Sequence, residues 1–552
     1  MTLRFNAHLG EYVLYSDDEA AARACGLTLS RTARGPNGEK AWYPAAHDDG
    51  RTAVDNPYAV LRFYREADPA ARARLKPYWE DYQASWATDC DREFPAPSGK
   101  SFLPYQRAGI AYCLRKGNAI IGDEPGLGKT VQAIGLANAL GARRTLVICP
   151  ATIRLNWRRE ILAWSSKPGV VPQVIETGWD HVNPRADYVV TSYELARKPA
   201  THEALCKLHW DMIVADEGHY LKSMEALRTR ALFGGGQLGS RFRNRHLAQS
   251  ADRIVTLTGT PLPNRPRESY MLARGCNWEA IDWLGKDAFE YRFNPSARYG
   301  DHTVEKTGRI PELQARLRCN LMVRRHKADV LKDLPDKRYE MTYVAENGAI
   351  RDVLARERLL DFDPAQLFNS DYRIDGQVST VRREMGEAKV PRVIEHLRYL
   401  LDIVELPKAV VFSHHRSVMD ALHEALHRYG VVAVRGGMTT AAKQASVDAF
   451  VADPAVRIFS GQLDASGFGV DGLQRVCTHA VFAEPAWTPG VNEQAVDRLH
   501  RIGQHDNVVA QFLIVEGSLD ERVLSAVLDK ARTIHETLDN RLDRDPPAAL
   551  AA

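Results

Sequence analysis

A glycine-rich segment at residues 122–130, GDEPGLGKT, has the residue types needed to hold phosphate groups. Glycine lets backbone amides approach an anion closely, so amides around Gly126 and Gly128 could surround the phosphates of a nucleotide. Lys129 would reach the β- and γ-phosphates, and the Thr130 hydroxyl would bind Mg²⁺. The segment therefore predicts a site for ATP and magnesium.

One position departs from the strict phosphate-loop pattern, which has glycine where this chain has Asp123. The flanks still match, because the apolar run NAII precedes the segment and the helical run VQAIGLANAL follows it. A strand, a loop and a helix in that order would also place the positive end of the helix at the phosphates. We take the whole segment as the nucleotide contact: Asp123, Glu124, Gly126, Leu127, Gly128, Lys129 and Thr130.

Two adjacent carboxylates follow a second apolar run, in DMIVADEGH at residues 211–219. A strand that delivers acidic groups at its carboxyl end suits a metal and nucleotide site. Asp216 would hold magnesium, and Glu217 would orient and deprotonate the attacking water. An Asp-Glu pair after a strand can also simply cap a helix, but the upstream phosphate loop favours the catalytic interpretation.

A third segment, TLTGTP at residues 256–261, places hydroxyls and a glycine at the end of another apolar run. Such groups could sense the γ-phosphate and couple its loss to motion, although turns of this composition are common. The candidates for this coupling are Thr258, Gly259 and Thr260.

A fourth segment, EQAVDRLHRIGQ at residues 493–504, contains two arginines. On a helix, Gln494, Asp497, Arg498 and Arg501 would share one face, because they are three or four residues apart. Such a face is usually a solvated stripe, but phosphoryl transfer needs cationic groups that stabilise charge in the transition state. We therefore expect Arg498 and Arg501 to act as arginine fingers, and Gln494 to join them in the catalytic group.

The elements that must position these groups form two series of short apolar runs. Uninterrupted apolar runs separated by helical stretches are typical of parallel sheets that are covered on both faces. The first series is NAIIGDE, RTLVICP, DYVVTSY, DMIVADE and RIVTLTG, and the second is KAVVFSHH, VVAVRGG, VRIFSGQ, HAVFAEP and VVAQFLIV. The sequence thus predicts an α/β fold with two parallel-sheet lobes.

The rest of the chain divides around these lobes. The first lobe is expected at residues 98–275, helical insertions that bridge the lobes at 276–392, and the second lobe at 393–540. Residues 1–97 are rich in aromatics and turns and predict a small α/β accessory module, with a helix around Tyr78–Gln83 that starts near Pro77. The last segment, 541–552, is expected to be disordered.

Composition sets broad limits on the class of protein. A chain of 552 residues is too long for one core, and a net charge of +3 neither demands nor excludes a polyanionic partner. The eight cysteines form no C-x-x-C pair, so zinc ribbons and a disulfide framework are not expected. We expect no secretory signal and no membrane span, hence an intracellular protein that is cytoplasmic or nucleoid-associated.

The ordered set of motifs resembles the superfamily-two helicases, and specifically the Swi/Snf-type double-strand DNA translocases, whose lobes are RecA-like. The likeness extends over about residues 100–530. Within the family, VFAEPAWTPG and the short insertions resemble the compact annealing-helicase and fork-remodelling branch. The matching blocks are LPYQRAGIAYCL, TLVICPATIRLNWRREILAW, DEGH, LTGTP, MVRRHKADVLKDLPDK and AWTPGVNEQAVDRLHRIGQ.

This resemblance implies ATP-dependent movement along double-stranded or forked DNA, with contacts to the phosphate backbone and little base specificity. It implies that Gln106 recognises adenine. The candidate DNA contacts are Thr191 and Tyr193 at a strand end, and Trp487. The glycine-rich block before that tryptophan departs from the family pattern, because it reads SGFGVDGLQ at residues 466–474.

Several aromatic and basic groups keep two interpretations at this stage. Trp42, Tyr43 and Tyr64 could stack on exposed bases or form the core of the accessory module. The basic loop with Arg241, Arg243 and Arg245 could contact DNA or be a solvated loop, and the cluster Arg324, Arg325 and Lys327 could instead pair with acidic neighbours such as Asp329 and Asp333.

Two other functions remain open. An RNA- or single-strand-stimulated helicase of the same superfamily would share the nucleotide site. A nucleotide-switched DNA-binding protein with negligible turnover would be expected to lack Glu217 or the arginine fingers, which this chain has. The sequence leaves open the protein partners, the oligomeric state and the direction of travel.

Overall fold

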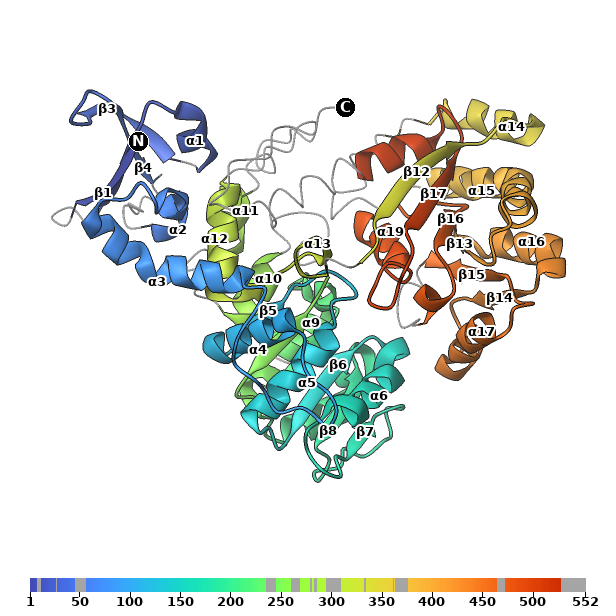
Figure 1. Cartoon of the computed structure of the whole chain (residues 1–552), viewed down its shortest axis with the longest axis horizontal. Helices are drawn as coiled ribbons and strands as arrows, with labels where there is room; N and C mark the ends of the chain where they lie inside the picture. Colours follow the sequence, from blue (N-terminus) through green and yellow to red (C-terminus); the bar gives the residue numbers. More distant parts are fainter. Residues whose placement is uncertain are drawn as a thin grey trace.

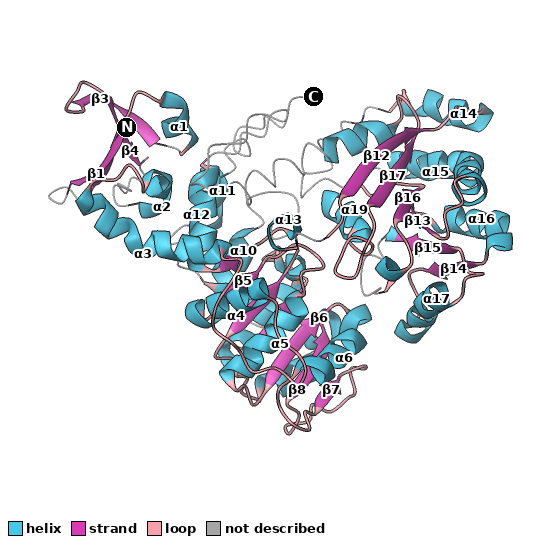
Figure 2. Ribbon diagram, viewed as in Figure 1, coloured by secondary structure: helices cyan, strands magenta, loops and turns pink. Residues whose placement is uncertain are grey.

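The structure, a computed structural model, places three bodies around a central region (Figure 1). A small module at the N-terminus lies beside a first α/β lobe, and a second α/β lobe lies on the other side. Figure 2 shows that each lobe is a sheet flanked by helices. The structure describes residues 1–6, 11–25, 27–44, 56–234, 245–259, 269–277, 280–281, 285–293, 309–331, 334–360, 362, 376–463 and 472–527.

Some residues singled out in the sequence lie outside this description. They are Thr260, Arg241, Arg243 and Asp333, most of the glycine-rich block 466–474, and the tail 541–552.

The first lobe is a seven-stranded sheet in the order β11-β5-β10-β9-β6-β8-β7, and every strand pair is parallel. Both faces are covered, because alternate residues of one strand enter different cores: Met212 and Val214 enter one, Ile213 and Ala215 the other. The strands are β5 Ala119–Ile121, β6 Thr145–Cys149, β7 Pro172–Val174, β8 Tyr188–Ser192, β9 Met212–Asp216, β10 Ile254–Leu257 and β11 Met322–Val323.

Helices of the first lobe connect these strands and form its covering layers. They are α4 Pro104–Lys116, α5 Lys129–Leu140, α6 Arg154–Trp164, α7 Tyr193–Ala196, α8 Pro199–Cys206, α9 Leu227–Phe233, α10 Ser269–Cys276, α11 Lys286–Phe293 and α12 Ile310–Asn320.

The second lobe is a six-stranded parallel sheet in the order β12-β17-β16-β13-β15-β14. Its strands are β12 Lys337–Tyr343, β13 Ala409–Ser413, β14 Val431–Val434, β15 Ile458–Gln462, β16 His479–Phe482 and β17 Val508–Ile514. Its helices include α14 Gly348–Glu357, α15 Gly376–Arg398, α16 Arg416–Leu426, α17 Thr440–Ala452 and α19 Pro489–Val496. All ten strands expected from the apolar runs are present, and the α/β class with two parallel-sheet lobes is confirmed.

The predicted helical bridge at residues 276–392 is wrong as a separate unit. This segment carries β11, which is an edge strand of the first sheet, and β12, which is an edge strand of the second. Neither strand has the apolar pattern of a central strand, because β11 is two residues long and β12 reads KRYEMTY. The chain therefore passes from one lobe to the other between Val323 and Lys337.

The accessory module is a four-stranded antiparallel sheet in the order β1-β2-β4-β3, which packs on helix α3, Pro69–Trp86. The predicted helix start near Pro77 is wrong, because Asp68 caps the helix by accepting from the amide of Ala71 at 2.8 Å. The other elements are β1 Thr2–Asn6, β2 Glu11–Tyr15, α1 Glu19–Ala24, β3 Leu27–Arg34, β4 Lys40–Pro44 and α2 Pro57–Val60.

The aromatic residues of this module favour a structural role over base stacking. Trp42 is fully buried, and its indole nitrogen donates to the carbonyl of Ser16 at 2.9 Å. The Tyr64 ring stacks on Trp79 with 4.7 Å between ring centroids. The tryptophan that sequence alone left undecided therefore belongs to the module's core.

The module is fixed to the first lobe through α12, which lies beside it in Figure 1. Ala315 and Cys319 of α12 belong to the same hydrophobic cluster as the module's core residues. Glu312 of that helix is buried and accepts from the Asn56 amide at 3.0 Å. Burial by itself would raise the pKa of Glu312, but the buried guanidinium groups of Arg316 and Arg292 lower it to about 2.

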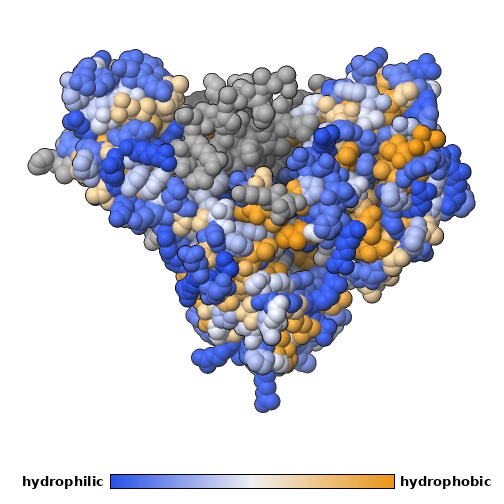
Figure 3. Space-filling model, in the orientation of Figure 1, coloured by the Kyte–Doolittle hydropathy of each residue, from blue (hydrophilic) through white to orange (hydrophobic). Residues whose placement is uncertain are grey.

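The surface of the molecule is uneven in polarity. On the face shown in Figure 3, hydrophilic residues cover most of the accessory module, and hydrophobic residues gather toward the middle of the molecule and on part of the second lobe.

Among the described helices, none combines the length and the apolar character needed to cross a membrane. All eight cysteines are free thiols, as the absence of paired spacing predicts.

A buried carboxyl group in the second lobe, that of Glu357, makes the stability of the folded protein depend on pH. Burial raises the pKa of Glu357 from 4.5 to about 7, and the charge of Asp520 adds to this effect. The folded state holds this proton more tightly than the unfolded chain does. The stability that the proton contributes is complete below about pH 4.5 and is lost as the pH rises through about 7.

We expect Glu357→Gln to raise the Tm above that of the unmodified protein at about pH 8 and to change it little at about pH 4. The amide oxygen of glutamine can still accept from the Leu519 amide, which bonds Glu357 at 2.8 Å. Thermal unfolding followed by circular dichroism at the two pH values checks this. An equal shift at both would contradict a titrating carboxyl.

Candidate nucleotide site between the lobes

The phosphate loop lies between β5 and α5, as the sequence predicts. Its glycines adopt left-handed backbone conformations, with φ of 89° at Gly126 and 70° at Gly128. Gly128 is also the N-cap of α5, and a Cβ there would lie 2.6 Å from Nε2 of Gln106. Only glycine meets both the conformation and the space, so the loop can turn tightly into the helix.

Lys129 begins α5, and its side chain folds back over the loop. Its Nζ donates to the carbonyl oxygens of Asp123 at 2.8 Å and Glu124 at 3.3 Å. Burial lowers the pKa of Lys129, although the carboxylates of Glu217, Asp123 and Asp216 act in the opposite direction. A cation held this way is available to phosphate oxygens.

The two predicted carboxylates lie at the carboxyl end of β9. Asp216 is held from two sides, because its Oδ1 accepts from the Glu217 amide at 2.8 Å and its Oδ2 accepts from the indole of Trp157 at 2.7 Å. Burial, and then the charge of Glu217, raises the pKa of Asp216 above its ordinary value. A buried and a half-buried carboxylate side by side favour a bound cation.

Glu217 has an unusual backbone conformation for a residue with a side chain, with φ of 52°. Non-glycine residues in this region are strained and concentrate at functional sites. Its Oε2 lies 3.3 Å from Nδ1 of His219. Burial would raise the pKa of Glu217, but His219, Lys129 and Arg498 lower it, so the carboxylate stays ionised.

A cleft between the lobes brings these groups together with the arginines of the second lobe. Arg498 and Arg501 line the same cleft as Lys129 and Glu217, so the expected arginine fingers lie at the same site as the phosphate loop and the carboxylates. The cleft is lined by Pro125, Gly126, Gly128, Lys129, Thr130, Val131, Ile153, Asn156, Trp157, Arg159, Glu160, Asp216, Glu217, Asp497, Arg498 and Arg501.

The helix predicted to carry the arginines is shorter than expected. α19 ends at Val496, so Asp497, Arg498 and Arg501 lie in the turns that follow it. Gln494 is buried within the helix and is not among the residues that line the cleft. We call residues 497–501 the arginine loop.

Other predicted nucleotide contacts have different surroundings. The carboxylate of Asp123 does not face the cleft, because it pairs with the guanidinium of Arg325 and accepts from Gln132 at 2.8 Å. The Glu124 carboxylate bonds His326 at 2.7 Å. Both residues therefore meet Lys129 through their backbone carbonyls, and their contact with a nucleotide stays a prediction.

The buried Gln106 and Leu127 support the loop from behind. Gln106 Oε1 accepts from the Leu103 amide at 3.0 Å, and its Nε2 donates to the Leu127 carbonyl at 3.5 Å.

Two of the coupling candidates lie at the end of β10, where the Thr258 amide donates to the Ile121 carbonyl at 3.1 Å. The Gly259 carbonyl accepts from Arg324 at 3.0 Å.

The three predicted DNA contacts are corrected, because their side chains are buried. The exposed fractions of Thr191, Tyr193 and Trp487 are 0%, 3% and 7%. The Tyr193 hydroxyl donates to the Asp216 carbonyl at 2.7 Å, so it supports the carboxyl end of β9. Trp487 stacks on Phe362. The motif resemblance identified these positions, but it carried no information on burial.

Sequence reasoning missed the partners of the catalytic groups. Trp157 orients Asp216, and the only signal for it was its place in a matching block. For the cluster Arg324, Arg325 and Lys327, one of the two interpretations was pairing with acidic neighbours in the sequence, but Arg325 pairs with Asp123 and Lys327 with Asp497. These partners lie far away in the chain, and local spacing does not indicate them.

The residues present fit ATP and magnesium. The Thr130 hydroxyl and the Asp216 carboxylate supply the oxygen ligands that Mg²⁺ prefers, and both line the cleft. The left-handed glycines leave the backbone open to phosphates, and Lys129, Arg498 and Arg501 supply positive charge around them. Bound Mg²⁺ would neutralise charge on the β- and γ-phosphate oxygens.

Comparisons with known proteins agree with this site. The SNF2-related domain family matches residues 83–355, and the helicase conserved C-terminal domain family matches residues 392–503. The chain belongs to the Snf2-related ATPases of helicase superfamily two. The two matched regions contain the phosphate loop with its carboxylates and the arginine loop, respectively.

Relatives of this Snf2-related chain include proteins named for DNA annealing. The DNA annealing helicase and endonuclease ZRANB3 of Bos taurus is 30% identical over 467 residues, which cover 80% of this chain and 41% of the relative. The SWI/SNF-related matrix-associated actin-dependent regulator of chromatin subfamily A-like protein 1 of Xenopus tropicalis is 28% identical over 453 residues, which cover 79% of this chain and 45% of the relative. The chain thus spans less than half the length of these relatives.

A solved structure was also matched. The Sulfolobus solfataricus SWI2/SNF2 ATPase core in complex with dsDNA is 20% identical, with 81% of this chain and 94% of that chain covered and a TM-score of 0.39.

Proposed function

We propose that the protein hydrolyses ATP between its lobes and uses the energy to translocate along double-stranded DNA, remodelling forks, junctions or protein–DNA complexes. One observation carries this proposal: the cleft takes its phosphate loop and carboxylates from one lobe and its arginines from the other. A nucleotide bound there would contact both lobes, so its hydrolysis would change their separation, as a motor requires.

Each residue has a role in this proposal. Lys129 holds the β- and γ-phosphates, Thr130 and Asp216 hold magnesium, and Glu217 orients the attacking water and takes its proton. Arg498 and Arg501 stabilise the charge that develops on the transferred phosphoryl group. The ionised state of Glu217, which the neighbouring cations favour, is the state that a general base needs.

Duplex DNA is the proposed track because the two relatives described above are named for DNA annealing and chromatin regulation. Contacts to the phosphate backbone would give binding that weakens with salt and has little dependence on sequence. Such a substrate would place the protein inside the cell with the nucleoid.

ATP hydrolysis measured with duplex DNA, single-stranded DNA and RNA tests the substrate. We expect duplex DNA to stimulate the rate most, and displacement of a third strand from a triplex to require both ATP and a duplex track. Greater stimulation by RNA or single-stranded DNA would favour an RNA- or single-strand-stimulated helicase of the same superfamily. Tight ATP binding with negligible turnover under every condition would favour a nucleotide switch.

A further inference from the structure

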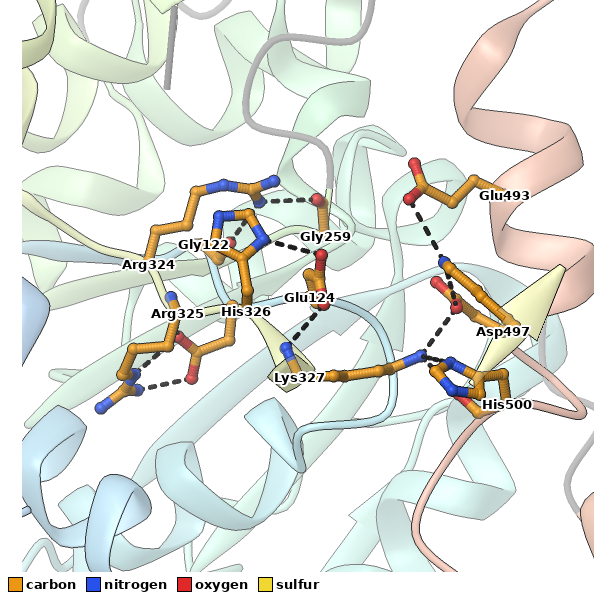
Figure 4. Close-up of polar contacts among 12 residues, drawn as sticks. Gly122, Glu124, Gly259, Arg324, Arg325, His326, Lys327, Glu493, Asp497 and His500 are labelled. Atoms are coloured by element: carbon orange, nitrogen blue, oxygen red, sulfur yellow. Dashed lines mark hydrogen bonds and ion pairs between the residues drawn. The ribbon is translucent and has the colours of Figure 1, made fainter. Parts of the chain in front are cut away.

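Four consecutive basic residues, Arg324, Arg325, His326 and Lys327, lie where the chain leaves the first lobe for the second. We call residues 324–327 the basic strap. Their side chains are buried or nearly so, which is unusual for charged groups unless they are paired. Figure 4 shows the strap between the two lobes, with Glu493, Asp497 and His500 facing it from the second lobe.

The sheet register places the strap against the phosphate loop. β11 and β5 are adjacent parallel strands in which Val323 pairs with Ile121, so the residues that follow each strand continue side by side. The Gly122 amide donates to the Val323 carbonyl at 2.8 Å, and the Glu124 amide donates to the carbonyl of the strap's second residue at 3.2 Å. The first residues of the strap thus extend the edge strand along the phosphate loop, and Lys327 begins the short helix α13, Lys327–Val330.

The first two side chains of the strap grip this loop. Arg324 donates to the carbonyls of Gly122 at 2.7 Å and Gly259 at 3.0 Å, so it joins the phosphate loop to the end of β10. Arg325 donates through Nε to the Asp123 carboxylate at 2.9 Å. These bonds fix the strap on the first lobe.

The last two residues share one carboxylate of the phosphate loop. Glu124 accepts from Nδ1 of His326 at 2.7 Å and from the Lys327 amide at 2.7 Å. The backbone of Lys327 therefore belongs to the first lobe, and its side chain also passes close to the loop: a Cβ on Gly126 would lie 3.4 Å from Lys327 Cε.

The Lys327 ammonium group reaches the second lobe and binds the arginine loop at two points. It donates to the Asp497 carboxylate at 2.7 Å and to the His500 carbonyl, as Figure 4 shows. Asp497 directly precedes Arg498, and His500 directly precedes Arg501. One lysine thus holds the residue before each arginine.

We propose that Lys327 is a positioning residue for ATP hydrolysis, which sets the arginine loop against the phosphate loop. This inference rests on the proposed ATPase function and goes beyond it, because Lys327 is not required to touch the nucleotide. Lys337 supports the same carboxylate, with Nζ 3.3 Å from Asp497. Arginines placed by a bond of this kind need little rearrangement when charge develops on the phosphates.

Substitutions of the pair test this proposal if stability is measured alongside catalysis. Removing one member of a buried ion pair leaves an uncompensated charge, which by itself destabilises the fold. We therefore compare Lys327→Met, Asp497→Asn and the double variant, in which both charges are absent. Lys389→Met is the matched control, because Lys389 makes an equally buried bond to Asp520 at 2.6 Å within the second lobe alone.

We expect Lys327→Met to lower kcat about 10²-fold, the scale of a small misplacement of reacting groups. KM for ATP and the Kd of a non-hydrolysable ATP analogue should change less than about threefold, because the phosphate loop is intact. The double variant should keep the kcat defect even where its Tm recovers, and Lys327→Arg should restore part of the rate. Lys389→Met should lower Tm without a selective loss of kcat.

The outcomes separate the two proposals. If the unmodified protein binds the analogue but does not hydrolyse ATP with any nucleic acid, the proposed function fails. If it hydrolyses ATP and the folded double variant retains its kcat, Lys327 does not position the arginines and the inference is overturned. If the fall in kcat of Lys327→Met is no larger than its fall in Tm explains, as expected for Lys389→Met, the inference is also overturned.

Discussion

Replacing Arg501 by alanine is expected to suppress ATP hydrolysis by on the order of 10³-fold while ATP binding persists. Arg501 comes from the second lobe and lines the same cleft as Lys129, whereas the phosphate loop proposed to bind ATP belongs to the first lobe. A loss of this size corresponds to about 4 kcal/mol of transition-state stabilisation. Steady-state ATPase rates, together with the Kd of a fluorescent ATP analogue, measure the two effects separately.

Controls for Arg501 distinguish geometry from charge. Arg501→Lys keeps the charge but lacks the planar fork that binds two phosphate oxygens, so it should recover only part of the rate. Arg428→Ala should leave the rate unchanged, because Arg428 is exposed and pairs with Asp402. It lies just before β14, which is at the other edge of the second sheet from β12. Undiminished hydrolysis by Arg501→Ala would exclude this arginine from the site.

Replacing Lys129 by alanine is expected to abolish ATP turnover through loss of phosphate binding. The Lys129 ammonium group bonds the carbonyls of Asp123 and Glu124 and interacts with the carboxylates of Asp216 and Glu217, so it supplies positive charge directly at the phosphate loop. The substitution would also leave Asp216 and Glu217 without their shared neighbour. We expect a fall of at least about 10³-fold in kcat/KM and a weaker affinity for the ATP analogue.

The affinity measurement gives the two substitutions different signatures. Lys129→Ala should weaken ground-state binding, whereas Arg501→Ala should act mainly on the transition state. Lys207→Ala serves as the first-lobe control, because Lys207 is exposed and pairs with Glu203 one helical turn away. Normal turnover by Lys129→Ala would mean that ATP is not hydrolysed at this loop.

The arrangement of the strands was predictable where each strand is central. Runs such as TLVIC and MIVAD are apolar throughout because both faces of a central parallel strand are buried. The edge strands escaped prediction for different reasons: β11 has only two residues, too few to form a pattern, and β12 is largely exposed and carries charged and polar residues. The boundary between the lobes was misplaced for these reasons.

The DNA contacts show a different limit of sequence reasoning. A motif match fixes which residues stand at a position, but burial depends on what packs over them. Thr191 and Tyr193 lie at the carboxyl end of β8, yet the Tyr193 side chain lies inside the first lobe and donates to the Asp216 carbonyl. The exposed part of the basic loop that the structure describes, Arg245, keeps its two interpretations.

The sequence by itself determined most chemical groups of the candidate nucleotide site and the lobe that supplies each of them. A glycine-rich loop between a strand and a helix, or a carboxylate pair after a strand, is local in the chain, so its residues already contain the information. Only the tertiary structure decided how the lobes are joined at the cleft. Arg325 meets Asp123 across 202 residues, and Lys327 meets Asp497 across 170, because strand order and lobe packing bring them together. Such pairings depend on the whole fold, which the spacing of residues within one segment does not specify.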